Sequence, residues 1–399
     1  MRLLLLKNTS LNCSCSRADA DDRGDSTLAM TRTSLLLPVA LFALTAPVSS
    51  YSTSFNDAWR KFRRSQFVLG QESVAYIEER ITRDEGSRGI GDVAPAVRGD
   101  LLKAAEHLAR LPENSTVVIL SGFPCCVEFS PPTETDGPSG AFAVARSCVA
   151  LGLNALILTD ACNEEVFVSG AAKAGPWAAA CNGKLRIEAF PPEKEWGEGE
   201  AGRLQDISKR AGHIVCIERP GRAKDGSCYT MRAISMDRYL APLDRLIELS
   251  KAANPDLAVT AIGDGGNELG FGKVYEETIK SKNILIPDKC VSVVPCDNLI
   301  VCSVSNWGGF GLAAAAAMIK YEDGWNLDAR AVVKKCLPSA EDEARILAAC
   351  VEAGCRDGVS REMAETVDGM PLEASLSCLR DIATICEAVR REMRSDYGK

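Results

Sequence analysis

Residues 257–273 read LAVTAIGDGGNELGFGK and join an apolar run to a loop that holds five glycines. The apolar part, 257–262, is short and uninterrupted, which predicts a buried strand. Glycine lets a backbone adopt positive φ and approach a ligand closely, and the loop adds the charges of Asp264, Glu268 and Lys273. An elaborate strand-to-helix turn is the structural alternative, but a turn needs fewer glycines. We therefore predict a ligand or metal loop at the carboxyl end of a parallel strand, where open α/β sheets bind their ligands.

Short apolar runs recur along the chain and predict the other strands of this sheet. They are residues 115–120, 155–158, 185–189, 213–217, 290–294 and 299–304. Segments with a helical spacing of apolar residues separate several of them, at 139–153, 164–173, 238–252 and 310–320. Strands that alternate with helices pack as a parallel sheet between two helical layers. The predicted fold class is α/β, a doubly wound, mostly parallel sheet with helices on both faces and a helical C-terminal flank.

The chain divides into a leader and one α/β domain. The leader, residues 1–55, contains the apolar run SLLLPVALFALTA (34–46), which is too short to span a bilayer comfortably and precedes small residues. We predict a targeting segment that is removed or disordered, so that the mature protein has no membrane span. The domain, 56–399, is predicted as a helical preface, an α/β core and a flank made of helices only, at residues 56–112, 113–322 and 323–399.

Charge and residue usage exclude several classes of function. The net charge is −8 and the pI is about 5.2, which argues against a nucleic-acid partner. The two histidines, His107 and His213, have no zinc-type spacing, so a histidine-rich metal site is not expected. The 17 cysteines are scattered and mostly lie in apolar runs, where a free thiol packs as a small hydrophobe. They indicate a reducing compartment.

Polar residues gather directly after the predicted strands. In a parallel sheet these strand ends share one edge, so side chains far apart in sequence converge on one crevice. Four carboxylates there can act as acid, base or metal ligand; they are Glu134, Asp136, Asp264 and Glu268. Carboxylate oxygens suit Mg²⁺, so Asp136, Asp264 and Glu268 are also candidates for binding this ion, the one cofactor that the sequence suggests. Asp136 has a structural alternative as a helix cap.

A second set of residues at the same edge suits an anionic substrate. Arginine grips a carboxylate through forked hydrogen bonds, and the N–H groups of glycine loops and helix starts hold anions. The predicted substrate-binding residues are Arg219, Arg222, Arg232, Glu218, Gly265, Gly266, Asn267, Lys273, Ser305 and Asn306. Surface ion pairs and helix starts are the structural alternatives. The chain has no Walker loop and no G-x-G-x-x-G after its first strand, so we expect a small acidic metabolite as its partner.

Five motifs in chain order carry a family resemblance. They are SGFP (121–124), ETDGP (134–138), IERPGR (217–222), IGDGGNELGFGK (262–273) and VSNWGG (304–309). From about residue 60 to about residue 390 the chain resembles the C-terminal domain of D-glutamate cyclase. The resemblance implies a lyase that converts D-glutamate to 5-oxo-D-proline with loss of water. It also implies a mitochondrial location, as in animal members, and a secretory-pathway leader is the alternative.

The predicted residues fit that reaction. A carboxylate such as Asp264 or Glu134 would take a proton from the amine, which then attacks the γ-carboxyl group. Arg219 or Arg222 would hold the α-carboxylate, while an acid, a metal ion or oxyanion donors would help water to leave. The main task of the enzyme would be to fold a flexible substrate so that its amine and carboxyl group meet.

Two other classes of function stay open. Residues 263–268 also resemble the G-D-G-x-N-D magnesium loop of haloacid-dehalogenase-type phosphatases, and 134–137 faintly resemble their D-x-D-G nucleophile motif. Glu134, however, stands where the nucleophilic aspartate belongs. The other class is a non-catalytic binder of an acidic metabolite. Animal D-glutamate cyclases carry an additional N-terminal domain, which we do not expect within these 399 residues. If that domain contributes to the activity, this protein is expected to act differently or with a partner. A homo-oligomer is a further expectation.

Overall fold

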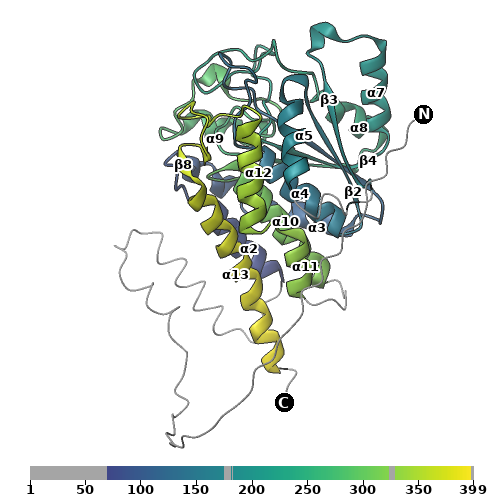
Figure 1. Cartoon of the computed structure of the whole chain (residues 1–399), viewed down its shortest axis with the longest axis vertical. Helices are drawn as coiled ribbons and strands as arrows, with labels where there is room; N and C mark the ends of the chain where they lie inside the picture. The colour runs from purple at the N-terminus through teal and green to yellow at the C-terminus, as the bar shows by residue number, and fades with distance from the viewer. Residues whose placement is uncertain (1–69, 175–180, 182, 323–328, 397–399) are drawn as a thin grey trace, which may run out of the picture. The chain divides into compact units, whose positions relative to one another are not determined.

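The computed structural model describes residues 70–174, 181, 183–322 and 329–396. Six parallel strands form its central sheet (Figure 1). Their order across the sheet is β3-β2-β1-β4-β5-β6, and every neighbouring pair is parallel. The strands are β1 (Thr116–Ser121), β2 (Asn154–Asp160), β3 (Leu185–Phe190), β4 (Ala211–Ile217), β5 (Ala258–Gly263) and β6 (Asn298–Val301). The predicted doubly wound α/β class is confirmed.

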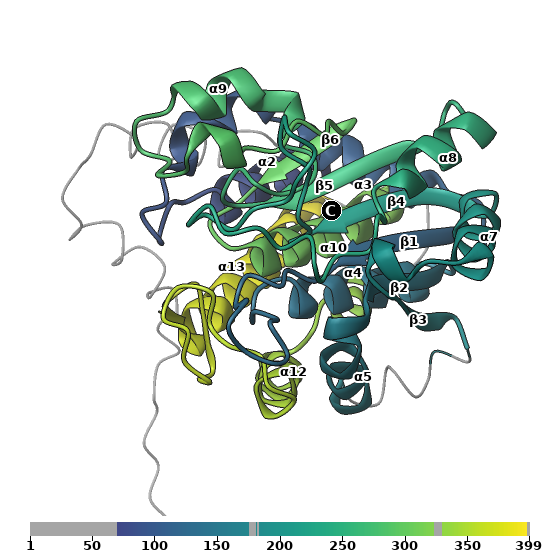
Figure 2. The same ribbon diagram turned by 90° about the horizontal axis from the view of Figure 1, so that it is seen from above.

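The chain changes its winding direction between β1 and β4. It adds β2 and β3 on one side of β1, and then crosses to add β4, β5 and β6 on the other side. Ser121 of β1 is in register with Ile217 of β4, which is in register with Ile262 of β5. The carboxyl ends of these three strands therefore lie level, and the strands run side by side in Figure 2. This is the kind of switch point at which a parallel sheet opens a crevice.

Helices cover both faces of the sheet. One face packs on α3 (Asp100–Arg110), α4 (Pro138–Ala150), α5 (Glu164–Lys173) and α10 (Ser305–Glu322). The other face packs on α7 (Glu198–Ser208) and α8 (Arg245–Ala253). Leu204 of α7 and Leu246 of α8 share a hydrophobic core with Val118 and Leu120 of β1. A short helix, α9 (Tyr275–Lys280), follows the glycine loop.

Helix α10 lies at the centre of the helical side. Its sequence, SNWGGFGLAAAAAMIKYE, has no polar stripe before Lys320, and every residue from Ser305 to Ile319 is buried. A helix that is apolar all round is buried all round. Its neighbours are α3, α4, α2 (Gly70–Ile81), α11 (Ala329–Cys336) and α13 (Leu372–Asp396). Helix α12 (Ala340–Glu352) completes this outer layer against α5 (Figure 1).

Two predicted elements differ from the structure. Residues 290–294 form no strand, because the N–H group of Ser292 donates to a loop carbonyl oxygen and not to a neighbouring strand. The helix predicted at 238–252 begins only at Arg245. Pro242 accounts for this delay, since a proline disfavours helical backbone in the residue before it.

The C-terminal flank is not purely helical, contrary to the prediction. It contains a two-stranded antiparallel hairpin, β7 (Thr366–Val367) and β8 (Met370–Pro371). The turn between these strands is Asp368-Gly369, and both residues have positive φ, at 53° and 77°. Asp-Gly is a favoured pair for a tight hairpin turn. The hairpin matters because it brings Asp368 to the candidate site.

The predicted leader, residues 1–55, lies outside the described residues. Within the described ranges no helix is long and apolar enough to cross a membrane. The 15 cysteines in those ranges carry free thiols, as the sequence predicts.

Helix α12 places a buried acid against the core. Glu343 is fully buried, and its Oε2 accepts a hydrogen bond from the Ser139 hydroxyl of α4. Its Oε1 has no hydrogen-bond partner within the described residues. Burial raises the pKa of Glu343 from 4.5 to about 7. The folded chain therefore holds a proton that the unfolded chain releases at lower pH.

We expect this group to make the free energy of unfolding fall as the pH rises from 4.5 to about 7, by about 1.4 kcal/mol per pH unit. Glu343→Gln removes the effect, because an amide does not titrate and can still accept the Ser139 hydrogen bond. Denaturant unfolding at a series of pH values should give a flatter stability curve for this variant. Glu341→Gln, at an exposed position of the same helix, should follow the wild type, and parallel curves for all three proteins would contradict the prediction.

Candidate active site

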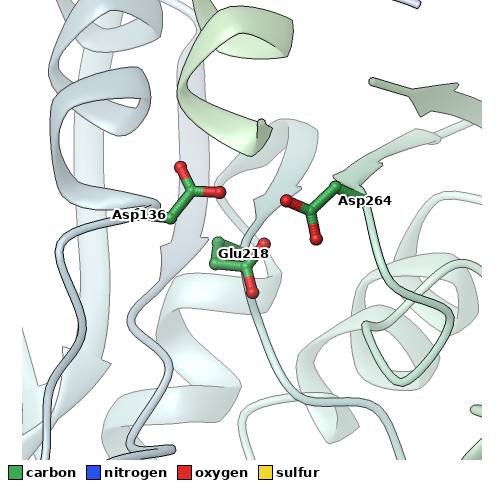
Figure 3. Close-up of side chains that lie close together, drawn as sticks. All are labelled: Asp136, Glu218 and Asp264. Atoms are coloured by element: carbon green, nitrogen blue, oxygen red, sulfur yellow. The ribbon is translucent and has the colours of Figure 1, made fainter. Parts of the chain in front are cut away.

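Three carboxylates from three strand connections come together in the described part of the chain (Figure 3). Asp136 precedes α4, Glu218 directly follows β4, and Asp264 directly follows β5. One oxygen of each lies within 4.8 Å of the oxygens of the other two, and all three side chains are buried. Figure 3 shows their carboxylates directed toward one another. We call these three residues the carboxylate trio.

Two helices exchange their N-terminal caps beside the trio. Asp136 accepts hydrogen bonds from the N–H groups of Ser305 and Asn306 in the first turn of α10, at 2.8 Å each. Asn306 Oδ1 in turn accepts hydrogen bonds from the N–H groups of Gly137 and Gly140 at the start of α4, at 3.1 and 2.7 Å. Asp136, just before α4, thus caps α10, and Asn306, in the first turn of α10, caps α4. The positive ends of both helix dipoles lie beside the carboxylates.

Glycine makes this close approach possible. A Cβ on Gly309 of α10 would lie 2.6 Å from the Cα of Gly140 of α4. Gly137 has a φ of 101°, and a Cβ there would lie 2.8 Å from the Cβ of Glu218. Glu218 itself has a φ of 40°, which is uncommon for a residue other than glycine. Its Oε2 accepts a hydrogen bond from Ser305 Oγ at 2.6 Å, so the start of α10 holds two members of the trio.

The predicted metal ligand Glu268 braces its own loop. Its carboxylate accepts hydrogen bonds from the N–H groups of Asp264, Gly265 and Gly266, at 2.7, 2.6 and 2.6 Å. The N–H groups of the two glycines, predicted to bind substrate, therefore face Glu268. Glu218, which the sequence suggested for substrate binding, stands with Asp264 in the trio where Glu268 was expected.

Two residues of the site escaped the sequence analysis, Arg88 and Asp368. The Arg88 guanidinium reaches both oxygens of Asp264, with Nη2–Oδ1 at 3.0 Å and Nη1–Oδ2 at 3.2 Å. Its Nη1 also lies 2.9 Å from Oδ2 of Asp368. Neither residue follows a strand of the main sheet, so the pattern of polar residues at strand ends could not reveal them. The Asp-Gly pair was the available signal for the turn that carries Asp368.

Burial favours the protonated form of each carboxyl group in the trio. It raises the pKa of Asp136 to about 8, and Asp368 adds to this rise. It also raises the pKa of Glu218 well above its usual range, with a further contribution from neighbouring carboxylates. For Asp264 burial again has the largest effect and raises the pKa, while Arg88 opposes the rise. Protons or a cation must neutralise such a group of carboxylates.

Glu134, a predicted catalytic residue, is buried and lies outside the trio. Its Oε2 packs directly on the backbone of Gly358, where a Cβ would come within 1.9 Å of it. Burial raises the pKa of Glu134 well above its usual range, and the carboxylates of Asp368 and Asp136 contribute to the rise. A carboxyl group with a raised pKa suits proton transfer near neutral pH.

The other predicted substrate-binding side chains have partners outside the trio. Arg219 binds Asp160 and the carbonyl oxygen of Ala241, Arg222 binds Asp244, Arg232 donates to the carbonyl oxygen of Val359, Lys273 binds Asp100, and Asn267 donates to the carbonyl oxygen of Tyr229. The structure therefore brings Ser305, Asn306 and Glu218 to the centre of the site, and the three predicted arginines make their ion pairs and hydrogen bonds elsewhere.

The fold and the trio together define a class, parallel α/β proteins with a buried acidic site at the switch point of the sheet. Comparison with known proteins makes the assignment more specific. The family described as D-glutamate cyclase-like, C-terminal, matches residues 77–383, and the chain belongs to this family. It is similar to D-glutamate cyclase, mitochondrial, of Homo sapiens, with 32% identity over 324 residues, which are 76% of this chain and 50% of the human protein. The chain thus spans about half the length of that relative.

The buried pair of Arg219 and Asp160 predicts a large effect on stability. Arg219 Nη2 lies 3.0 Å from Asp160 Oδ1, its Nη1 binds the other oxygen, and both side chains are at most 3% exposed. Arg219→Met should lower the free energy of unfolding by about 3–5 kcal/mol, because it leaves a buried carboxylate unpaired. Arg222→Met, in a pair whose arginine is 37% exposed, should cost about 1 kcal/mol or less. Equal losses in denaturant unfolding would contradict this distinction.

Proposed function

We propose that this protein is a hydro-lyase of the D-glutamate cyclase type that converts D-glutamate to 5-oxo-D-proline and water. The observation that carries the proposal is the convergence of Asp136, Glu218 and Asp264 at the switch point of a domain of the D-glutamate cyclase-like family. The human relative is mitochondrial by its name, and we extend this location to the present chain as part of the proposal.

The reaction moves protons without a net change in their number. The ammonium group of the substrate loses two protons when its nitrogen becomes the N–H of the lactam. One oxygen of the γ-carboxylate takes up two protons and leaves as water. A carboxyl group that accepts a proton at the nitrogen and donates one at the departing oxygen therefore serves both steps. Glu134 suits this role better than Asp264, because it stands outside the trio and Asp264 is bound by Arg88.

The trio fits a divalent cation such as Mg²⁺. Three buried carboxylate oxygens within 4.8 Å of one another repel unless protons or a cation neutralise them. A set of oxygen donors is what Mg²⁺ prefers. Asp136, Glu218 and Asp264 would hold the ion, which when bound would polarise a carboxyl oxygen as a Lewis acid. The start of α10 keeps Asp136 and Glu218 in place through backbone N–H groups and the Ser305 hydroxyl.

The phosphatase alternative has weaker support. It needs a nucleophilic carboxylate at the position of Glu134, which packs against Gly358 in a loop well beyond β1. It also needs the last acidic residue of the glycine loop near the metal, and Glu268 is bound by three N–H groups of its own loop.

The direct test is to incubate the purified protein with D- or L-glutamate, with Mg²⁺ or with EDTA, and to follow 5-oxoproline by chiral chromatography. We expect metal-dependent turnover of the D form alone. Glu134→Gln and Asp264→Asn should each lower kcat by about a hundredfold or more. Asp206→Asn, on the surface of α7, is the control. Folded protein that leaves D-glutamate unchanged would contradict the proposal, and release of phosphate from p-nitrophenyl phosphate would support the phosphatase alternative.

Glu218→Gln should separate metal binding from folding. The amide can still accept the hydrogen bond from Ser305 Oγ, but one buried charge is gone. We expect the variant to lose binding of Mn²⁺, measured by electron paramagnetic resonance, and to unfold in EDTA with a free energy about 1 kcal/mol or more above that of the wild type. Full Mn²⁺ binding, or a less stable variant, would count against the trio as a cation site.

A further inference from the structure

We propose that Arg88 is the carboxylate-binding residue of this site, and that Asp368 occupies its guanidinium until a substrate carboxylate replaces it. The inference rests on the proposed function, because a dicarboxylate such as glutamate needs a cation to enter an acidic site. Three lines of observation support it, namely the backbone that presents Arg88, the contacts of its guanidinium and the distribution of charge around it.

The backbone around Arg88 is held firmly in an unusual conformation. The carboxylate of Asp84 accepts hydrogen bonds from the N–H groups of Arg88 and Gly89, at 2.7 and 2.8 Å. Ser87 and Gly89, on either side, have φ of 53° and 85°, and a serine rarely adopts such a value. Backbone of this kind persists only where its surroundings fix it, and it is concentrated at binding and catalytic sites. The loop thus presents one side chain in a fixed position.

The Arg88 side chain is partly exposed, and its guanidinium lies against the glycine loop. A Cβ on Gly265 would lie 3.2 Å from Nη2 of Arg88, so the glycine leaves room for the arginine. The Arg88 side chain is 20% exposed, whereas those of its partners Asp264 and Asp368 are 1% and 3% exposed. Arg88 is therefore the most exposed member of this group. Its planar fork matches the two oxygens of a carboxylate.

Arg88 has fewer contacts with Asp368 than with Asp264. Asp264 is bound through two nitrogen–oxygen pairs, but Asp368 only through Nη1–Oδ2 at 2.9 Å. That Oδ2 is buried and makes no well-aligned hydrogen bond within the described residues. One guanidinium thus serves two carboxylates and neutralises only one of their two charges. If the Asp368 side chain rotates away, Nη1 keeps its contact with Asp264 Oδ2 at 3.2 Å and gains a free direction for a substrate carboxylate.

Arg88 is the basic side chain at this site that can pair with the carboxylate of a substrate. In the described ranges it is the one basic side chain within 4.0 Å of the carboxylates of the trio or of Asp368. Arg219, Arg222 and Arg232, the arginines predicted for this role, bind other partners. A substrate carboxylate placed among buried acids without a cation would be strongly unfavourable. Arg88 supplies the missing interaction.

Binding of glutarate, a dicarboxylate without an amine, tests Arg88 independently of turnover. Arg88→Lys keeps the charge and removes the fork, so the Kd for glutarate should rise about tenfold or more. Asp368→Asn removes the competing carboxylate, so the Kd should fall. A merely structural role for the pair would not produce these opposite signs. Isothermal titration calorimetry on the full chain measures both, with Arg203→Lys, an exposed arginine of α7, as the matched control.

The outcomes separate this inference from the proposed function. Unchanged glutarate binding in both variants, or no glutarate binding by folded wild-type protein, would overturn the role of Arg88. The expected pattern of Kd values without turnover of D-glutamate would support Arg88 and overturn the cyclase reaction. If Arg88→Lys does not fold, the Kd of Asp368→Asn for glutarate decides the question: a lower Kd than that of the wild type supports the role of Arg88, and an unchanged or higher Kd overturns it. In active enzyme both variants should shift the KM for D-glutamate in the same directions as the Kd, with a smaller change in kcat.

Discussion

The contact between the starts of α4 and α10 is the constraint on which the rest of the site depends. Gly140 and Gly309 let the two backbones meet, and the side chains of Asp136 and Asn306 then cap each other's helix. Neither helix can shift without exposing the N–H groups of the other. Because the pair lies at the switch point of the sheet, this exchange of caps also sets where the acidic side chains stand.

This arrangement is energetically unfavourable because it buries several carboxyl groups close together. The carboxyl groups of Glu134, Glu218 and Asp264 have raised pKa values because they are buried together. A chain selected for stability alone would place apolar side chains there. The apolar core on both faces of the sheet and the buried part of α10, from Ser305 to Ile319, offset the loss. Sites that break the usual rules of burial in this way are commonly the functional ones.

The sheet and the polar residues at its carboxyl edge could be predicted from the sequence because both follow from local patterns. Short apolar runs that alternate with helical segments define the strands, and the polar residues after them include Asp136 and Asp264, which the structure brings together. The sequence could not show how each polar group is satisfied. Glu268 has the right type and position for a ligand, but its own loop supplies three donors to it. Arg88 and Asp368 reach the site only through tertiary packing, and the Asp-Gly pair marks a turn without showing that its aspartate enters the site.

The hairpin of β7 and β8 is synthesised after all the other parts of the site. Arg88 precedes the first strand of the sheet, and Asp368 lies after α12, near the end of the described chain. All six strands and the trio have left the ribosome before the hairpin is made, and domains begin to fold during synthesis. A nascent chain that ends before the hairpin therefore contains every strand of the sheet and the trio, but it lacks Asp368, the second carboxylate at Arg88. The hairpin, one of the later segments to be translated, therefore completes the electrostatic surroundings of a site whose three central carboxylates precede it in the chain.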